Sequence, residues 1–244
     1  MRAPEGWAAK CPAFEPGESL SEARRLGHFH NLVIVLSFAY WMEWVANSPR
    51  QVEPYAEEMF HLASEHGFPI FSGLAATYRG WSSAALGKAS QGVSFLTEGL
   101  ALVRATGTVM GTTVALTMLA DACAKSGQAE ESLQRFAEAG RIIETNDERY
   151  GEAEFCRLRG RLLNGSGNRT AAERNYHQAL AVAQRQNARL WELRTATSLA
   201  GLWCDQGKRA EARDVLAPVY GWFTEGLDTP VLKEAKALLD ELAS

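Results

Sequence analysis

Apolar residues recur every three or four positions through most of this chain, which is the spacing of one face of an α-helix. No stretch alternates apolar and polar residues for long enough to require a β-strand. Residues that suit helix ends separate the periodic segments, and they recur every 40 residues at Gly27, Gly67, Gly107, Asp147 and Asn187. Gly and Asn tolerate the left-handed backbone conformation that closes many helices. The pattern therefore predicts an all-α chain with an internal repeat.

A second series with the same 40-residue step marks a turn within each repeat, at Asn47, Gly87, Gly127, Gly167 and Gly207. The residues just before these turns are mostly small: Tyr40, Gly80, Ala120, Gly160 and Ala200. After each turn a small column (Val52, Gly92, Ser132, Ala172, Ala212) precedes a larger one (Ala56, Leu96, Phe136, Tyr176, Leu216) by four residues. Small residues facing large ones predict pairs of helices that pack closely.

Together, the two series predict five helical hairpins in a repeat domain over residues 18–244, after an irregular segment at 1–17 that is rich in Pro and Gly. A short helix is expected at 18–26. The first helices of the hairpins are expected near 30–46, 69–86, 109–126, 149–164 and 189–206. The second helices are expected near 52–66, 89–106, 129–145, 169–186 and 209–223. Thr229 can cap a final helix that begins at Pro230 and ends near Leu242.

Three positions depart from the regular pattern. Pro54 lies too deep for a helix that begins at Pro49, so that helix is expected to begin near Val52. Pro218 should kink or end its helix and leave Tyr220, Trp222 and Phe223 as an irregular apolar cluster. Asp147 stands where Gly is expected, which indicates a looser turn.

Composition narrows the functional classes. The net charge of −4 gives no reason to expect a nucleic-acid partner. The four cysteines have no CxxC spacing, and all but Cys11 fall in apolar helical stretches, which favours reduced, buried thiols. The N-terminus lacks the apolar core of a signal peptide. The most apolar run, Leu32 to Ala46, is too short to span a bilayer. We therefore expect a cytoplasmic protein without a membrane partner.

No arrangement of residues points to catalysis. Gly87-Lys88-Ala89 lacks the first Gly and the hydroxyl of a phosphate-binding loop. Neither His28 with His30 nor His61 with His66 has further ligands at a metal-binding spacing. The sequence predicts no enzyme, cofactor or metal site.

The order of small residue, Gly turn, small residue and large residue resembles the tetratricopeptide repeat (TPR), most clearly from Arg159 to Leu180 and from Leu199 to Val219. The resemblance implies a right-handed α-solenoid with a capping helix, although the usual repeat is about 34 residues. Residues 150–242 also look like the C-terminal TPR region of bacterial regulators that join a class III adenylate or guanylate cyclase domain to an ATPase module. This implies a regulatory, protein-binding role in bacterial signalling, without cyclase or ATPase activity.

In TPR arrays the first helices line a concave groove, and equivalent positions here form a candidate binding face. Its members are Trp41, Trp81, Thr117, Asp121, Arg157, Arg161, Asn164 and Arg194. Arg157 and Arg161, four residues apart, could hold a carboxylate or phosphate bidentately. The groove is expected to bind a protein or peptide with apolar and acidic groups. Two alternatives stay open: Trp41 and Trp81 are core residues beside a solvated arginine face, or the groove binds a small molecule and controls a cyclase, ATPase or transcriptional effector.

Overall fold

The computed structural model describes residues 16–243, which form twelve α-helices without any β-strand. Before the hairpins comes α1 (Pro16–Leu26). The first helices of the hairpins are α2 (Phe29–Val45), α4 (Pro69–Ala85), α6 (Thr112–Lys125), α8 (Glu152–Gly165) and α10 (Arg189–Cys204). The second helices are α3 (Pro49–Glu65), α5 (Ala89–Ala105), α7 (Ala129–Asn146), α9 (Arg169–Arg185) and α11 (Arg209–Tyr220). The last helix is α12 (Pro230–Ala243). Most of the predicted segment 1–17, together with Cys11 and Ser244, lies outside the described residues.

Both series of helix-ending residues are confirmed. All ten have positive φ, between 53° at Asn187 and 88° at Gly87. Within the described chain, Asn47, Asp147 and Asn187 are the three non-Gly residues with positive φ, and each occupies a position that the 40-residue step marks. The left-handed conformation ends a helix at each of these positions and turns the chain toward the next one.

Some predicted boundaries were wrong. α3 begins at Pro49 and contains Pro54. The helix tolerates this proline because only one hydrogen bond is lost, and the carbonyl group left without a partner belongs to the exposed residue Arg50. α6 and α8 each begin three residues later than expected. Gly111 has a φ of 84° just before α6. The hydroxyl of Thr229, expected to cap α12, is buried without a hydrogen-bond partner. The expected break near Pro218 is confirmed, since α11 ends at Tyr220.

The hairpins stack in chain order, and each second helix packs between its own first helix and the next one. The predicted small and large columns explain this packing. A Cβ atom at Gly80 would lie 2.6 Å from Cγ of Leu96 and 2.8 Å from the carbonyl oxygen of Gly92, so α4 and α5 approach at backbone contact. A Cβ atom at Gly160 would meet the Tyr176 ring at 2.7 Å. At the C-terminal end, α12 contacts both α10 and α11 and covers the last hairpin.

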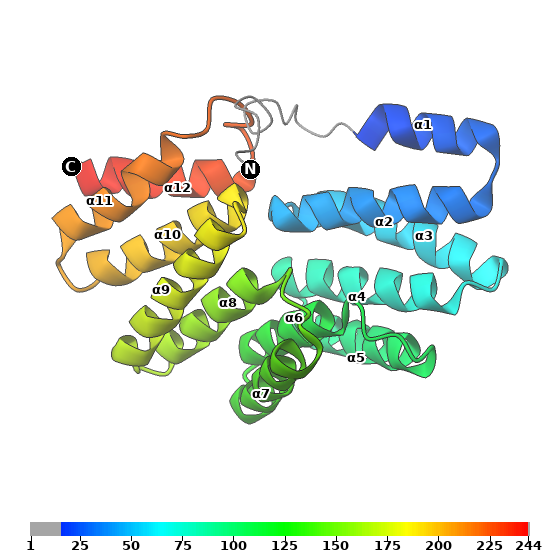
Figure 1. Ribbon diagram of the computed structural model, residues 1–244, viewed down its shortest axis with the longest axis horizontal. Coiled ribbons are helices and arrows are strands. Elements are labelled where there is room, and N and C mark those ends of the chain that lie inside the picture. Colours follow the sequence, from blue (N-terminus) through cyan, green and yellow to red (C-terminus); the bar gives the residue numbers. More distant parts are fainter. Residues whose placement is uncertain (1–15, 244) are drawn as a thin grey trace.

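The array bends into an arc that brings the C-terminal end of α2 beside α10 (Figure 1). The ring centroids of Trp44 and Trp191 lie 5.0 Å apart in an edge-to-face arrangement. Nη1 of Arg194 donates to the carbonyl oxygens of Trp44 and Val45, at 3.3 Å each. We call these contacts between the first and fifth hairpins the end-to-end clasp. It makes the fold more closed than a simple row of hairpins.

Candidate binding surface on the first helices

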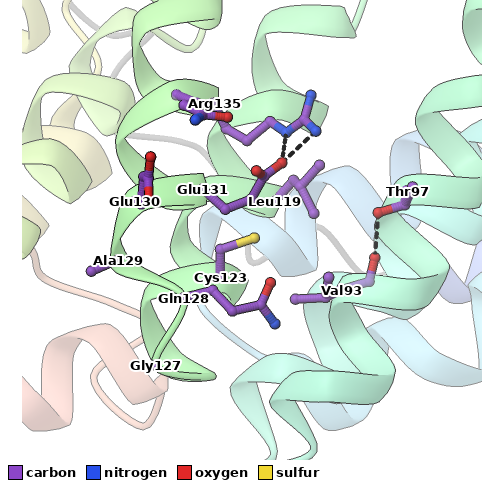
Figure 2. Close-up of a pocket in the computed structure, with 11 residues that line it drawn as sticks. Val93, Thr97, Leu119, Cys123, Gly127, Gln128, Ala129, Glu130, Glu131 and Arg135 are labelled. Atoms are coloured by element: carbon purple, nitrogen blue, oxygen red, sulfur yellow. Dashed lines mark hydrogen bonds and ion pairs between the residues drawn. The ribbon is translucent and has the colours of Figure 1, made fainter.

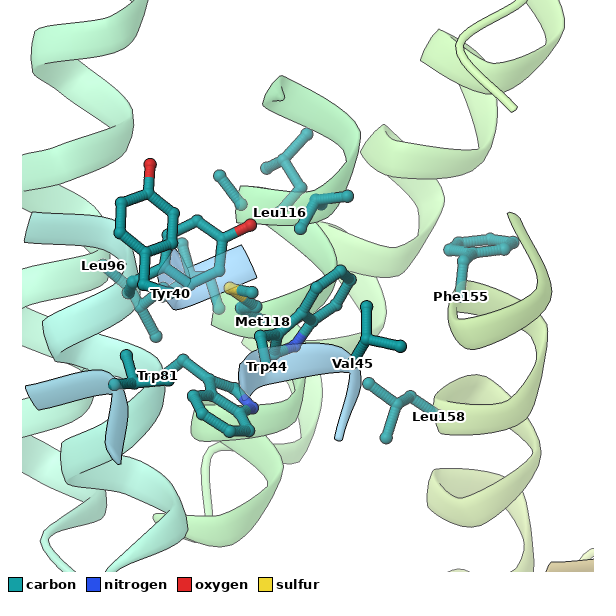
Figure 3. Close-up of a cluster of buried hydrophobic side chains, with 14 of the residues drawn as sticks. Tyr40, Trp44, Val45, Trp81, Leu96, Leu116, Met118, Phe155 and Leu158 are labelled. Carbon is teal, nitrogen blue, oxygen red and sulfur yellow. The ribbon is translucent and has the colours of Figure 1, made fainter. Parts of the chain in front are cut away.

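The aromatic part of the candidate face belongs largely to the core. Trp81 is 6% exposed and, with Tyr40 and Trp44, is part of the buried cluster that Figure 3 shows. Trp41 is half-buried and packs against the same cluster. The alternative in which these tryptophans are core residues therefore describes Trp81, whereas Trp41 retains some accessible surface.

The polar part of the face is divided in the same way. Thr117, Asp121, Arg157 and Arg194 are buried, Asn164 is half-buried and Arg161 is exposed. Thr117 donates its hydroxyl proton to the carbonyl oxygen of Thr113, a bond within α6. The candidate residues thus lie on neighbouring first helices as expected, but most of them contact the protein itself.

Glu154 is the centre of a buried ionic cluster. Nε and Nη2 of Arg157 each donate to a different carboxylate oxygen of Glu154 at 2.7 Å. Nη2 of Arg194 lies 2.8 Å from the same carboxylate. Burial alone would raise the pKa of Glu154, but the guanidinium groups of Arg157 and Arg194 outweigh it and hold this pKa below its usual range. The carboxylate is therefore ionised at neutral pH.

Arg194 joins this cluster to the end-to-end clasp. Burial lowers the pKa of its guanidinium to about 10, although the carboxylate of Glu154 acts in the opposite direction. The guanidinium is therefore still charged at neutral pH. It is stabilised by two kinds of negative charge. One is the carboxylate of Glu154, and the other is the partial negative charge of the carbonyl groups that end α2. Arg194 thereby ties α8 and α10 to α2.

A second ionic group lies one turn further along α6 and α8. Arg161 forms an ion pair with Asp121, and Nζ of Lys125 lies 3.0 Å from the other carboxylate oxygen. Burial would raise the pKa of Asp121, but Arg161 and Lys125 outweigh this and lower it. The side chains of Arg161 and Lys125 are 45% and 34% exposed, so both remain accessible from solvent.

The two groups carry more positive than negative charge. The cations are Arg157, Arg194, Arg161 and Lys125. The anions are Glu154, Asp121 and Glu234, whose carboxylate interacts with Arg194, which leaves four minus three, or one, positive charge in excess. This excess lies on a protein whose net charge is −4. The face is therefore suited to an additional anionic group, and its accessible cations are Arg161 and Lys125.

Sequence reasoning missed Glu154, Lys125 and the clasp. Glu154 precedes Arg157 by three residues and Lys125 follows Asp121 by four, spacings at which helical side chains meet. A search for such pairs on the first helices could have found both. Trp44 and Trp191 are far apart in the sequence, and nothing in the repeat pattern pairs them.

A separate cavity of about 820 Å³ lies between α5, the end of α6 and the start of α7. Figure 2 shows Val93, Leu119 and Cys123 beside the polar side chains of Gln128 and Glu131. Burial raises the pKa of the Cys123 thiol, so this group is protonated at neutral pH. In the described chain, no set of three or more His, Cys, Asp or Glu side chains is placed to hold a metal ion. None of the helices that the structure describes has the length and apolar character needed to cross a bilayer.

The sequence matches no known protein-family model and no curated protein. Solved structures with the same fold include the apo form of RapI, with a TM-score of 0.66 and 13% identity over 93% of this chain and 76% of that one. The structure of BtubC (BKLC) from P. vanneervenii has a TM-score of 0.57 and 17% identity, over 93% of this chain and 87% of that one. The structure of a Podosopora anserina putative kinesin light chain with nearly identical TPR-like repeats has a TM-score of 0.51 and 15% identity, over 76% of this chain and 92% of that one. These similarities confirm a TPR-like all-α solenoid.

Proposed function

We propose that this chain is a non-enzymatic TPR scaffold that binds a protein or peptide partner through its first helices, as a regulatory module in bacterial signalling. The TPR-like fold supports a protein-binding role in general. The observation that carries the more specific proposal is the excess of one positive charge around Glu154 and Asp121, with the accessible cations Arg161 and Lys125.

The partner is expected to present an acidic group to Arg161 and Lys125. Both cations already share the carboxylate of Asp121, so a carboxylate from the partner would bind beside it and balance the one excess positive charge. Trp41 and Asn164 offer half-buried apolar and amide surface on the same row of first helices. The partner therefore combines an acidic group with apolar side chains, and its binding should weaken as salt is added.

The closed arc supports a second candidate function. Glu154, Arg157 and Arg194 are buried ionisable groups at the point where the first and fifth hairpins meet. A small anionic molecule that competed with Glu154 for these arginines would change the clasp. In this alternative the chain is a ligand-sensing domain that controls a cyclase, an ATPase or a transcriptional effector.

The test compares three forms of the protein in pull-downs from the native cell extract, with bound proteins identified by mass spectrometry. Arg161→Glu/Lys125→Glu reverses the accessible charge, whereas Arg213→Glu/Lys233→Glu reverses two charges on exposed residues of α11 and α12 as a control. The proposal expects the control to retain a specific partner that the first variant loses by at least tenfold. Equal recovery by all three forms would overturn it. A thermal shift with small anions, lost in Arg194→Met, would favour the second function.

A further inference from the structure

The cavity beside Cys123 lies at a place that other hairpins fill with a large side chain. It has a volume of about 820 Å³ and lies between the second helices α5 and α7 and the end of α6 (Figure 2). Because the chain repeats every 40 residues, each lining residue has equivalents in the other hairpins. These equivalents show which kind of group the space accommodates.

At the equivalent place two repeats later, the indole of Trp203 lies against α9. The centroids of the Trp203 and His177 rings are 5.8 Å apart, and Nε1 of Trp203 donates to the carboxylate of Glu173 at 2.9 Å. The indole is half-buried and packs against the apolar core of the last two hairpins. The first helix α10 thus sends an aromatic side chain over the second helix beside it.

The three equivalent residues that line the cavity are smaller and carry no aromatic ring. They are Val93, Thr97 and Cys123, in place of Glu173, His177 and Trp203. Cys123 is fully buried, so its side chain ends at the base of the cavity. A thiol therefore stands where the later repeat has an indole, and the space that the indole takes there is open here.

Another groove is also filled by the chain itself. The guanidinium of Arg79, on α4, lies 5.6 Å from the centroid of the Phe60 ring on α3 and 4.8 Å from that of the Phe95 ring on α5. One repeat later, the shorter Leu119 takes the place of Arg79 and lines the cavity. A guanidinium would lack one of its aromatic partners here, because Arg135 takes the place of Phe95. The missing group is therefore closer to an uncharged indole than to a guanidinium.

The lining of the cavity can make hydrogen bonds to such a ring. Nε of Arg135 donates to Oε1 of Glu131 at 2.7 Å, and Oε2 of this carboxylate has no hydrogen-bond partner in the described chain. The side-chain amide of Gln128 also has none among the described residues. Val93 and Leu119 supply apolar surface beside these groups. A volume of this size, with apolar walls and a few polar groups, is typical of sites that bind small molecules.

We propose that this cavity binds a flat aromatic ring of about the size of an indole that carries an N–H donor. The ring packs against Val93 and Leu119, and its N–H donates to Oε2 of Glu131 or to the amide oxygen of Gln128. Two carboxylates and one guanidinium line the cavity, which disfavours an anion. A free small molecule and a tryptophan side chain of a partner protein both carry such a ring. The site uses different residues from the candidate binding face on the first helices and does not depend on it.

Fluorine NMR titrations of the full chain test the proposal with two probes, fluoroindole and N-acetyl-fluorotryptophan amide. Wild type should bind fluoroindole with a dissociation constant of about 0.1–1 mM, which is usual for a ligand of this size. Equal binding of the amide would show that a tryptophan side chain fits as well, and binding of fluoroindole alone would assign the cavity to a small molecule. If neither probe binds below about 5 mM, the proposal is overturned.

Two variants fill the cavity and show whether the probe binds there. Cys123→Trp restores the residue that the later repeat carries, and Thr97→Trp fills the space from an exposed position on α5, where the fold is not at risk. Each should weaken the binding of fluoroindole at least tenfold. Cys123→Ala leaves the cavity open, and Arg161→Glu/Lys125→Glu changes only the face on the first helices, so both should bind as wild type does. Unchanged binding by the two Trp variants would overturn the proposal.

Thermal unfolding checks separately that an indole has room at position 123. Cys156 is also buried but does not line the cavity, so Cys156→Trp should lower the melting temperature by about 5 °C or more through overpacking. Cys123→Trp should keep the melting temperature within about 2 °C of wild type, because its ring enters space that is already open. Equal losses in the two variants would overturn the proposal, since an indole would then not fit where the later repeat holds one.

Discussion

Replacing Glu154 by Gln should strongly destabilise the protein. The side chain keeps its size but loses the charge that faces Arg157 at 2.7 Å and Arg194 at 2.8 Å. The side chains of all three residues are at most 8% exposed, so water cannot replace the lost carboxylate. Removing one partner from a buried ion pair costs about 3–5 kcal/mol, because the remaining charge stays buried. Here two arginines would lose their shared anion, which favours the upper part of this range.

Urea denaturation, followed by circular dichroism and tryptophan fluorescence, measures this loss. For an expected change of about 4 kcal/mol, the unfolding midpoint should fall by roughly 1 M or more. Glu58→Gln is the matched control. Glu58 also pairs with an arginine, Arg24, but their side chains are 32% and 48% exposed, and such pairs contribute about 0–1 kcal/mol.

A third variant separates lost charge balance from a general packing defect. Adding Arg194→Met to Glu154→Gln removes one of the two unpaired cations, and the flexible Met side chain fills part of the space. The double variant should therefore be more stable than Glu154→Gln alone, which is a non-additive result. If Glu154→Gln costs no more than Glu58→Gln, or if Arg194→Met only adds to the loss, the charge argument is refuted.

Three further outcomes follow from the structure. Arg157 and Arg194 lower the folded-state pKa of Glu154, so its stabilisation is fully present above the usual Glu pKa of about 4.3. It is lost as pH falls through the folded-state pKa, so the free energies of unfolding of wild type and Glu154→Gln should converge as the solution is acidified. Gly80→Ala should lower the free energy of unfolding, measured by heat or urea, by about 1–3 kcal/mol, because its Cβ atom would meet the backbone of α5. Gly201 has open space around it, so Gly201→Ala should stabilise α10 by about 0.5–1 kcal/mol. Trp44→Ala should lower the free energy of unfolding by about 3–5 kcal/mol. Because it removes the contact with Trp191, it should also increase the radius of gyration measured by X-ray scattering. An unchanged radius would show that this contact does not hold the arc closed.

The repeat could be predicted from sequence because each of its marker residues has a local physical reason. A left-handed helix end accepts Gly at no steric cost and Asn or Asp at a small one, so the ten marker positions are recognisable without tertiary structure. Gly80 and Gly160 are small because a helix backbone or an aromatic ring lies against them. Errors arose where neighbouring repeats intervene. The late start of α6 depends on the carboxylate of Glu148, which belongs to the following hairpin.

The candidate residues lie on the first helices, as the repeat predicts, but most of them are not free side chains. Arg157 was expected to receive an external carboxylate, and in the structure Glu154 of its own helix occupies both arms of its guanidinium. Periodicity places residues on a face, but it does not say how far the array curves. The contact of Trp44 with Trp191 depends on that curvature, which sums small rotations over five hairpins.

The clasp and the candidate binding face share one charged residue, Arg194, and this has an energetic consequence. Arg194 contacts both Glu154 and the carbonyl groups that end α2, so an anion that draws Arg194 away from Glu154 also weakens the contact between the first and fifth hairpins. A partner that binds only to Arg161 and Lys125 leaves those contacts in place. A ligand changes a conformational equilibrium only by the difference in its affinity for the two states. Binding at the accessible pair is therefore expected to leave the arc closed, whereas binding at the buried cluster is expected to open it.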